Sequence, residues 1–133
     1  MVTRRVLRED RGATLVEFAL SCVVLLMTLF GTIGFGLAVF QYNIVSNLAQ
    51  EGARWASVRG SSGGSADATA VQTFVQSRAL GMAPVVTTTW PDGSNVAGNR
   101  VQVIVREPFT PFTGFVPNAT LQLQSTAQMI IAR

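Results

Sequence analysis

The sequence predicts an α+β protein: a long N-terminal transmembrane helix extended into a small domain with a short helix and a three-stranded antiparallel sheet. Three observations support this prediction. No charged residue occurs from Phe18 to Gln50, although ionisable groups recur on both sides of that stretch. Apolar residues continue at helical spacing beyond it. The last part of the chain alternates apolar and polar residues, as half-buried strands do.

Composition agrees with one small domain beside a membrane segment. The chain has 133 residues, of which 48% are hydrophobic and only 13% are charged. The charged fraction is about half of that usual in soluble domains. The deficit is confined to one stretch, whereas a soluble core would interleave charged and apolar residues. This segregation is typical of a chain that crosses a bilayer.

The apolar span runs from Phe18 to Phe40 and contains 23 residues. As a helix it is about 35 Å long, against a hydrocarbon core of roughly 30 Å. A secretory signal peptide has a shorter apolar region followed by a small-x-small cleavage site, and neither feature fits here. The alternative is a buried helix of a soluble protein, which the 74 residues from Gly60 onward could hardly enclose.

The arginines predict the orientation of the span. Four of them precede it, at positions 4, 5, 8 and 11, whereas none follows it until Arg54. The positive-inside rule then leaves the N-terminus in the cytoplasm and exports the residues after the span. We therefore expect a single-pass protein of the inner (cytoplasmic) membrane with an extracytoplasmic C-terminal domain.

The helix is expected to continue to Arg59, because Gln41–Arg59 has no proline and keeps an apolar face at helical spacing. Small residues lie three and four apart within it, which permits either close contact with another helix or ordinary packing against the exported domain. Glycines and serines at 60–65 then predict a flexible joint. The small residues are Ala49, Gly52, Ala53 and Ala56, and the other apolar positions are Tyr42, Val45, Leu48 and Trp55.

A second helix is predicted from about Ala66 to Leu80, capped by Ser65 or Asp67 and closed by Gly81 with Pro84. Three strands follow it. The first is the β-branched run 85–90, which ends in the turn 91–93, the second contains the alternating valines 101, 103 and 105, and the third covers about 121–131. An antiparallel sheet covering one helix is the economical arrangement of these pieces.

The apolar stretch from Phe109 to Pro117 contains three phenylalanines. Two interpretations stay open for it. Packed over the sheet, it would belong to the core. Exposed, it would be a contact for a partner or for the membrane.

The segment from Arg11 to Phe18, RGATLVEF, places a carboxylate just inside an apolar helix. Such residues are costly and are functional by default. The segment resembles the processing site of prepilins, with a glycine before the cut and a glutamate as fifth residue of the mature chain. The resemblance implies cleavage between Gly12 and Ala13. It also implies that Glu17 is that glutamate and that Phe18 is the aromatic residue after it.

The resemblance extends beyond the cleavage site. RGATLVEFAL, the apolar helix and EGARWAS at 51–57 together resemble the TadE-like minor pseudopilins of tight-adherence (Tad/Flp) pilus systems, strongly over 11–59 and loosely beyond. The resemblance implies a leader at 1–12, a transmembrane and extended helix at 13–59 and an exported domain at 60–133. It implies as partners a prepilin peptidase, other pilin or pseudopilin subunits, an inner-membrane assembly platform and membrane lipid.

A mature chain of 121 residues is much longer than the very short major pilins of these systems. That length favours an accessory role, in which the protein primes or caps the filament. The free amine of Ala13 could then pair with Glu17 of a neighbouring subunit. The alternative for Glu17 alone is an interfacial residue near a helix N-terminus, where the helix dipole favours a negative charge.

Other function classes have little support. The chain has no histidine and no lysine, and its one cysteine, Cys22, lies in the apolar stretch. We therefore expect no enzymatic activity, no metal and no cofactor. The exported arginines are dispersed and nearly balanced by acids, so we expect no nucleic-acid binding. The alternative function is an uncleaved, signal-anchored binding module outside the membrane, from which processing by the peptidase would distinguish a pseudopilin.

Overall fold

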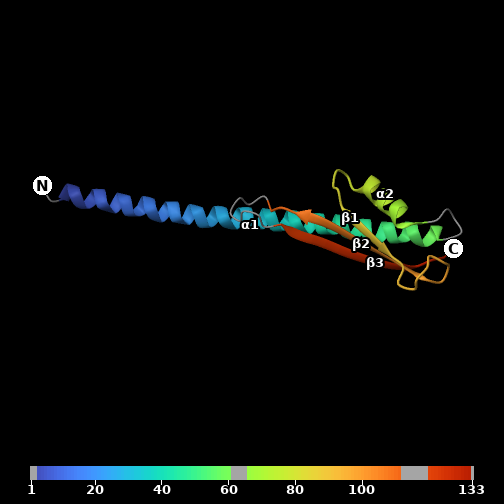
Figure 1. Cartoon of the computed structure of the whole chain (residues 1–133). Coiled ribbons are helices and arrows are strands. Elements are labelled where there is room, and N and C mark those ends of the chain that lie inside the picture. The colour runs from blue at the N-terminus through green and yellow to red at the C-terminus, as the bar shows by residue number, and fades with distance from the viewer. Residues whose placement is uncertain (1–2, 61–65, 112–119, 133) are drawn as a thin grey trace. The chain divides into compact units, whose positions relative to one another are not determined.

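A computed structural model describes residues 3–60, 66–111 and 120–132 of the chain (Figure 1). It contains α1 (Thr3–Arg59), α2 (Ala68–Arg78), β1 (Val85–Thr89), β2 (Arg100–Phe109) and β3 (Leu121–Ile130). These elements confirm the α+β fold with a long N-terminal apolar helix, a short helix and three strands. The chain divides into two units, Met1–Gly36 and Leu37–Arg133, and α1 contributes residues to both.

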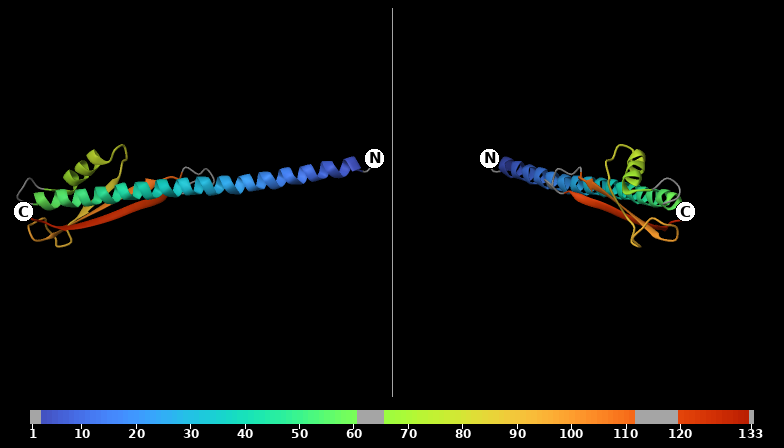
Figure 2. Two further views of the ribbon diagram at one scale, coloured as in Figure 1. Left: turned by 180° about the vertical axis from the view of Figure 1, so that it is seen from behind. Right: turned by 45° about the vertical axis from the view of Figure 1, so that its right-hand side comes forward.

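The second unit contains the sheet, which is an antiparallel meander in the order β1-β2-β3. Val103 on β2 is the register partner of Thr88 on β1 and of Ala127 on β3. Because directly paired residues share one face of a sheet, the alternating valines of β2 define an inner face. All three valines are fully buried: Val101, Val103 and Val105. Figure 2 shows the C-terminal part of α1 alongside this sheet in both of its views.

The core of the second unit joins the inner face of the sheet to α2 and to the C-terminal part of α1. Gly52 marks the point where all three meet, because a Cβ added there would approach Val75 of α2 and Val103 of β2. The small residues of α1 therefore pack against their own domain, which decides between the two interpretations left open by the sequence. The four of them are buried: Ala49, Gly52, Ala53 and Ala56.

The second helix is confirmed with narrower bounds than the sequence predicted. Asp67 is its N-cap, and its carboxylate accepts a hydrogen bond of 2.7 Å from the backbone N–H of Ala70. That bond satisfies one of the donors that a helix start leaves unpaired. The helix ends at Arg78, and Leu80 and Gly81 then take positive φ angles of 42° and 85°. Glycine adopts such a conformation without strain, which explains the stop at Gly81.

The connection from β1 to β2 is held by a charged pair. The Asp92 carboxylate accepts bonds from the Arg100 backbone N–H (2.8 Å), from Nε (3.2 Å) and from Nη2 (2.9 Å). Hydrogen bonds from the side chain and the backbone of Arg100 lower the pKa of Asp92 to about 2. In the expected turn, Gly93 donates to the carbonyl of Trp90 at 2.9 Å and has a φ of 87°.

Strand β2 is longer than the alternating valines indicated, since it continues through Pro108 to Phe109. A proline is tolerated there because β1 pairs with β2 only as far as Arg106, which leaves one side of Pro108 without a neighbouring strand. Phe109 is buried at the end of the strand, so this residue belongs to the core and not to a loop. Residues 112–117 of the predicted apolar loop lie outside the described residues.

Candidate functional site

The expected processing segment lies within α1. The backbone is helical from Thr3 onward, so the bond between Gly12 and Ala13 is part of a helix. Among the described residues, no atom beyond the local helix lies within 4 Å of a Cβ added to Gly12. The segment is therefore accessible, but its backbone is engaged in helical hydrogen bonds.

Glu17 and Phe18 follow one turn later, and both are exposed. Phe18 exposes 67% of its surface, and Leu15 and Val16 each expose 69%. Because residues four apart on a helix lie on the same side, Ala13 and Glu17 share one face. The structure thus places a carboxylate one turn from the position that would carry the mature N-terminal amine.

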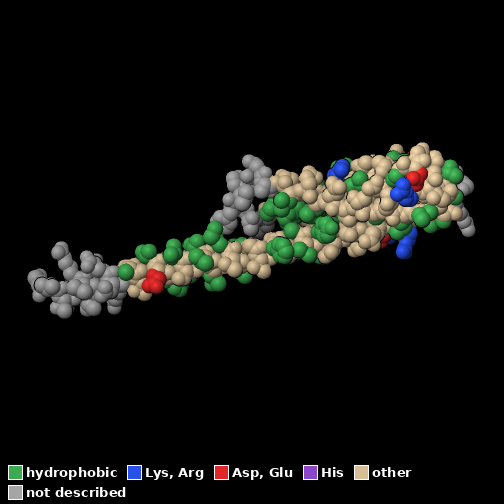
Figure 3. Space-filling model, turned by 90° about the horizontal axis from the view of Figure 1, so that it is seen from below, with side chains coloured by type: hydrophobic (Ala, Val, Ile, Leu, Met, Phe, Trp, Pro, Cys, Tyr) green, Lys and Arg blue, Asp and Glu red, His purple; other side chains and the backbone are tan. Residues whose placement is uncertain are grey.

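The apolar part of this helix is long enough to cross a membrane. One helix among the described residues meets that condition of length and composition, and it lies in the segment Gly12–Arg59 near the N-terminus. None of its most apolar window is buried within the chain. In the space-filling view, apolar side chains are visible along the N-terminal, apolar part of this helix (Figure 3). Such a surface requires cover from lipid or from other apolar helices.

The hydroxyl groups inside the apolar segment are satisfied within the helix. Ser21 donates to the carbonyl of Glu17 (2.9 Å), Thr28 to that of Val24 (2.9 Å) and Thr32 to that of Thr28 (2.8 Å). Each bond returns to the residue four positions earlier, so no second helix is needed to pair these groups. This arrangement suits a hydrocarbon environment, where an unpaired hydroxyl would be costly.

A second feature lies in the unit Leu37–Arg133, where α2 packs against the end of α1. The rings of Trp55 and Phe74 are stacked, with centroids 5.1 Å apart and planes at 19°. The guanidinium carbon of Arg59 lies 4.3 Å from the centre of the Trp55 ring, and that of Arg78 lies 5.3 Å from the centre of the Phe74 ring. At the far end of this row, Arg78 Nη1 is 3.6 Å from Glu51 Oε2.

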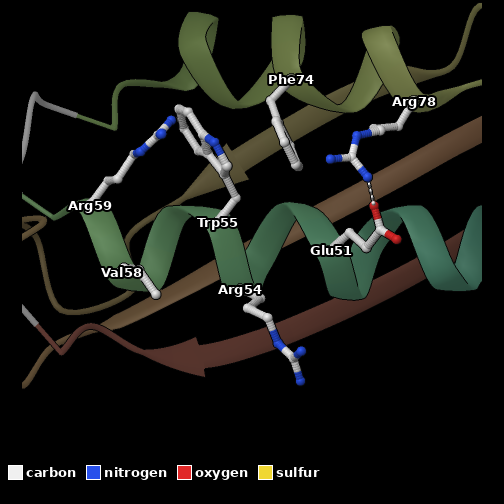
Figure 4. A pocket seen from close by; sticks show the side chains of 7 residues that line it. All are labelled: Glu51, Arg54, Trp55, Val58, Arg59, Phe74 and Arg78. Carbon is white, nitrogen blue, oxygen red and sulfur yellow. Dashed lines mark ion pairs between the residues drawn. The ribbon is translucent and has the colours of Figure 1, made fainter.

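These side chains line an open hollow of about 410 Å³, which we call the arginine–aromatic hollow (Figure 4). In Figure 4, Arg59 lies beside Trp55, while Arg54 points away from α2. The charged side chains of the lining comprise three arginines and one glutamate, so its formal charge is positive. The complete lining is Glu51, Arg54, Trp55, Val58, Arg59, Phe74 and Arg78.

Sequence reasoning placed Trp55 on an apolar helix face but missed the hollow. The signal was present, because Arg59 follows Trp55 by four residues and Arg78 follows Phe74 by four. That spacing puts a cation over an aromatic ring within one helix. The meeting of the two helices depends on the tertiary fold. No group of three or more His, Cys, Asp or Glu side chains that could hold a metal occurs among the described residues.

The comparisons with known proteins bear on the helical segment. No curated protein matches the chain, and neither does any solved structure. A family model described as TadE-like protein matches residues 12–54. The match begins at the expected cleavage glycine and ends at Arg54, at the edge of the arginine–aromatic hollow. It confirms, over residues 12–54, the resemblance to the TadE-like family that the sequence indicated.

Proposed function

We propose that this protein is a minor pseudopilin of a Tad/Flp-type pilus assembly system, in which it primes or caps the filament. The observation that carries the proposal is the exposed apolar helix from residue 12, headed by Glu17. Filament subunits of the type IV class need such a helix twice, first as a membrane anchor and then as the core of the fibre. The match of residues 12–54 to the TadE-like family supports this assignment.

Processing by a prepilin peptidase is the first step of the proposed function. Cleavage between Gly12 and Ala13 would remove all four N-terminal arginines and free an amine on Ala13. Since this bond lies within α1, the peptidase must open the helix locally before it can cut. Gly12 favours opening, because glycine destabilises a helix interior by about 1 kcal/mol relative to alanine. It also lets the backbone approach the peptidase closely.

Assembly is the second step. The amine of Ala13 on one subunit would pair with Glu17 of its neighbour, while Phe18 packs beside that pair. Pairing offsets the cost of burying both charges among apolar helices. Among the described residues of the apolar segment 12–40, Glu17 is the charged side chain, so it is the one available counter-charge there.

The proposed location is the inner membrane, with residues 1–12 in the cytoplasm and the domain from residue 60 outside it. The asymmetry of the arginines supports this orientation. A reporter enzyme that is active only outside the cytoplasm, fused after Arg133, should be active. Activity of the same reporter at the N-terminus, with a silent C-terminal fusion, would reverse the orientation.

Co-expression with a prepilin peptidase tests the proposal directly. Intact-mass measurement should show loss of residues 1–12, and N-terminal sequencing should begin at Ala13. The variant Gly12→Val should remain full-length because its bulky side chain prevents the backbone from approaching the peptidase closely. Gly31→Val is the matched control, since it makes the same change on the same helix at a site equally free of contacts. It should be cut normally.

The same experiment distinguishes a pseudopilin from the competing function, which is an uncleaved binding module. A native protein that keeps Met1–Gly12 in the presence of active peptidase would be a signal-anchored binding module. A chain cut at Gly12 that co-purifies with other pilus subunits would be a pseudopilin. Recovery of the cut chain from sheared filaments, in amounts far below the major pilin, would support the priming or capping role.

A further inference from the structure

We propose that the arginine–aromatic hollow binds an acidic peptide segment of a partner protein. The ion pairs among the described residues are Arg78–Glu51 and Arg100–Asp92. Arg54 and Arg59 therefore line the hollow without a carboxylate partner in the described part of the chain. A segment with carboxylate side chains would supply the missing negative charge. Gly12 and Glu17 belong to the first unit of the chain, whereas the hollow lies in the second unit. The inference therefore concerns a different site from those of processing and filament assembly.

Arg59 is the residue best prepared to receive a carboxylate. Its guanidinium lies over the Trp55 ring at 4.3 Å, so the side chain is already restrained before any partner arrives. A guanidinium that lies flat over an aromatic ring keeps its N–H groups free along its edge. That edge matches the two oxygens of a carboxylate in a bidentate pair. Arg59 therefore loses less side-chain entropy on binding than an unrestrained arginine would.

Arg78 provides a second contact that can be exchanged. Its 3.6 Å approach to Glu51 is long, and both side chains are more than half exposed, at 59% and 51%. An exposed pair of this kind contributes little to stability. An incoming carboxylate can therefore replace Glu51 as the partner of Arg78, or share Arg78 with it, at low cost. Arg78 stays above Phe74 in either case.

Between the cations lies an apolar floor. Trp55 and Phe74 are half-buried and stacked, and Val58 is exposed over 57% of its surface. A peptide can place an apolar residue on this floor beside a carboxylate at Arg59. A polynucleotide carries a charge on every residue and would bring phosphates close to Glu51. The mixture of charges in the lining therefore favours an acidic, partly apolar peptide over a nucleic acid.

The test uses the full chain in neutral detergent micelles. Trp90→Phe leaves Trp55 as the single tryptophan, because the chain has two. The probe is a labelled peptide of alternating Glu and Leu, compared with matched peptides that carry Gln or Lys in place of Glu. The Glu peptide should change the Trp55 emission and raise the anisotropy of its own label. The Gln and Lys peptides should do neither, and added salt should weaken the binding.

Three single substitutions locate the binding. Arg59→Gln should lower the affinity for the Glu peptide about fivefold to tenfold, since it removes a charge-assisted contact at an exposed site. Arg106→Gln makes the same change of charge on the outer face of the sheet, where Arg106 Nε donates to Gln124, and should leave binding unchanged. Glu51→Gln should tighten binding a few-fold, because it frees Arg78 and removes a repelling carboxylate.

Circular dichroism of each variant confirms that the fold is intact. The proposal is overturned by equal loss of binding in the Arg59 and Arg106 variants, by equal binding of the Glu and Gln peptides, or by no binding of the Glu peptide. Tighter binding of a single-stranded oligonucleotide than of the Glu peptide would overturn it in favour of nucleic-acid recognition.

Discussion

A Cβ atom added to Gly52 would lie 2.8 Å from Cγ2 of Val75, closer than nonbonded carbon atoms approach in folded proteins. Gly52 belongs to α1 and Val75 to α2, and both are buried. The missing side chain of Gly52 therefore sets how closely the two helices pack. The same glycine would present a Cβ 3.3 Å from Val103 of β2, so it also fixes the distance from α1 to the sheet.

We expect Gly52→Ala to destabilise the domain. Overpacking in a core costs typically 1–3 kcal/mol, and the gain in helix propensity returns about 1 kcal/mol. The net loss should be up to about 2 kcal/mol, measured by denaturant unfolding of the full chain in micelles. In a Val75→Ala background the same change should cost at least 0.5 kcal/mol less, because the colliding methyl groups are gone. An equal loss of stability in both backgrounds would show that Val75 does not limit how closely α1 and α2 pack.

Thr88 on β1 carries a buried hydroxyl group whose removal should stabilise the domain. The residue is 8% exposed, and its Oγ1 has no hydrogen-bond partner among the described residues. Thr88→Val keeps the shape and removes the unpaired hydroxyl, so we expect a gain of about 1 kcal/mol. Thr89→Val, on the exposed neighbour, is the control and should change stability by less than about 0.5 kcal/mol. Destabilisation by Thr88→Val would mean that the hydroxyl is paired in solution.

The pair of Asp92 and Arg100 predicts a pH dependence of unfolding. The pKa of Asp92 is about 2 in the folded protein, below its ordinary value of 3.8, so the unfolded state binds the proton more readily. The stabilising effect is complete above the unfolded pKa and is lost as the pH falls toward 2. Denaturation midpoints should fall less between pH 4 and pH 2 in Asp92→Asn than in the natural chain. If the midpoints of the two proteins fall equally between pH 4 and pH 2, the pair of Asp92 and Arg100 does not contribute to the loss of stability in acid.

Periodicity was sufficient to predict the elements of the domain. Alternating valines identified β2, and Ser65 or Asp67 together with Gly81 marked the ends of α2, because these signals act over a few residues. The extension of β2 through Pro108 was missed. Its tolerance depends on where β1 stops, which is a property of the assembled sheet and not of the local sequence.

The surfaces were harder to predict than the elements. The spacing of Gly52 and its small neighbours revealed a close-packed face but not what covers it, and only the fold places Val75 there. The two cation–aromatic pairs of the hollow come from different helices, so the spacing within either helix does not show that the two pairs meet. Glu17 and Phe18 are exposed, so their proposed roles rest on the sequence pattern and not on contacts within the described part of the chain.

Glu17 is the residue that decides whether the helix is built for assembly. If its carboxylate receives the amine of Ala13 from a neighbouring subunit, Glu17→Ala should still be inserted and still be cut after Gly12. The substitution leaves both the glycine and the helix unchanged. Assembly should fail, because the incoming amine would be buried without a counter-charge. Removing one partner of a buried pair costs about 3–5 kcal/mol, which lowers incorporation by two orders of magnitude or more.

Glu17→Gln is the matched variant, since it keeps the size and a hydrogen-bond acceptor but not the charge. It should restore incorporation only in part. The measurement is co-purification of each processed variant with the other pilus subunits, with intact mass as the control for cleavage. If the processed Glu17→Ala protein is incorporated normally, Glu17 is an interfacial helix residue. Its carboxylate would then be placed by the helix dipole and nearby water, and the exposed domain would become the functional part of the chain.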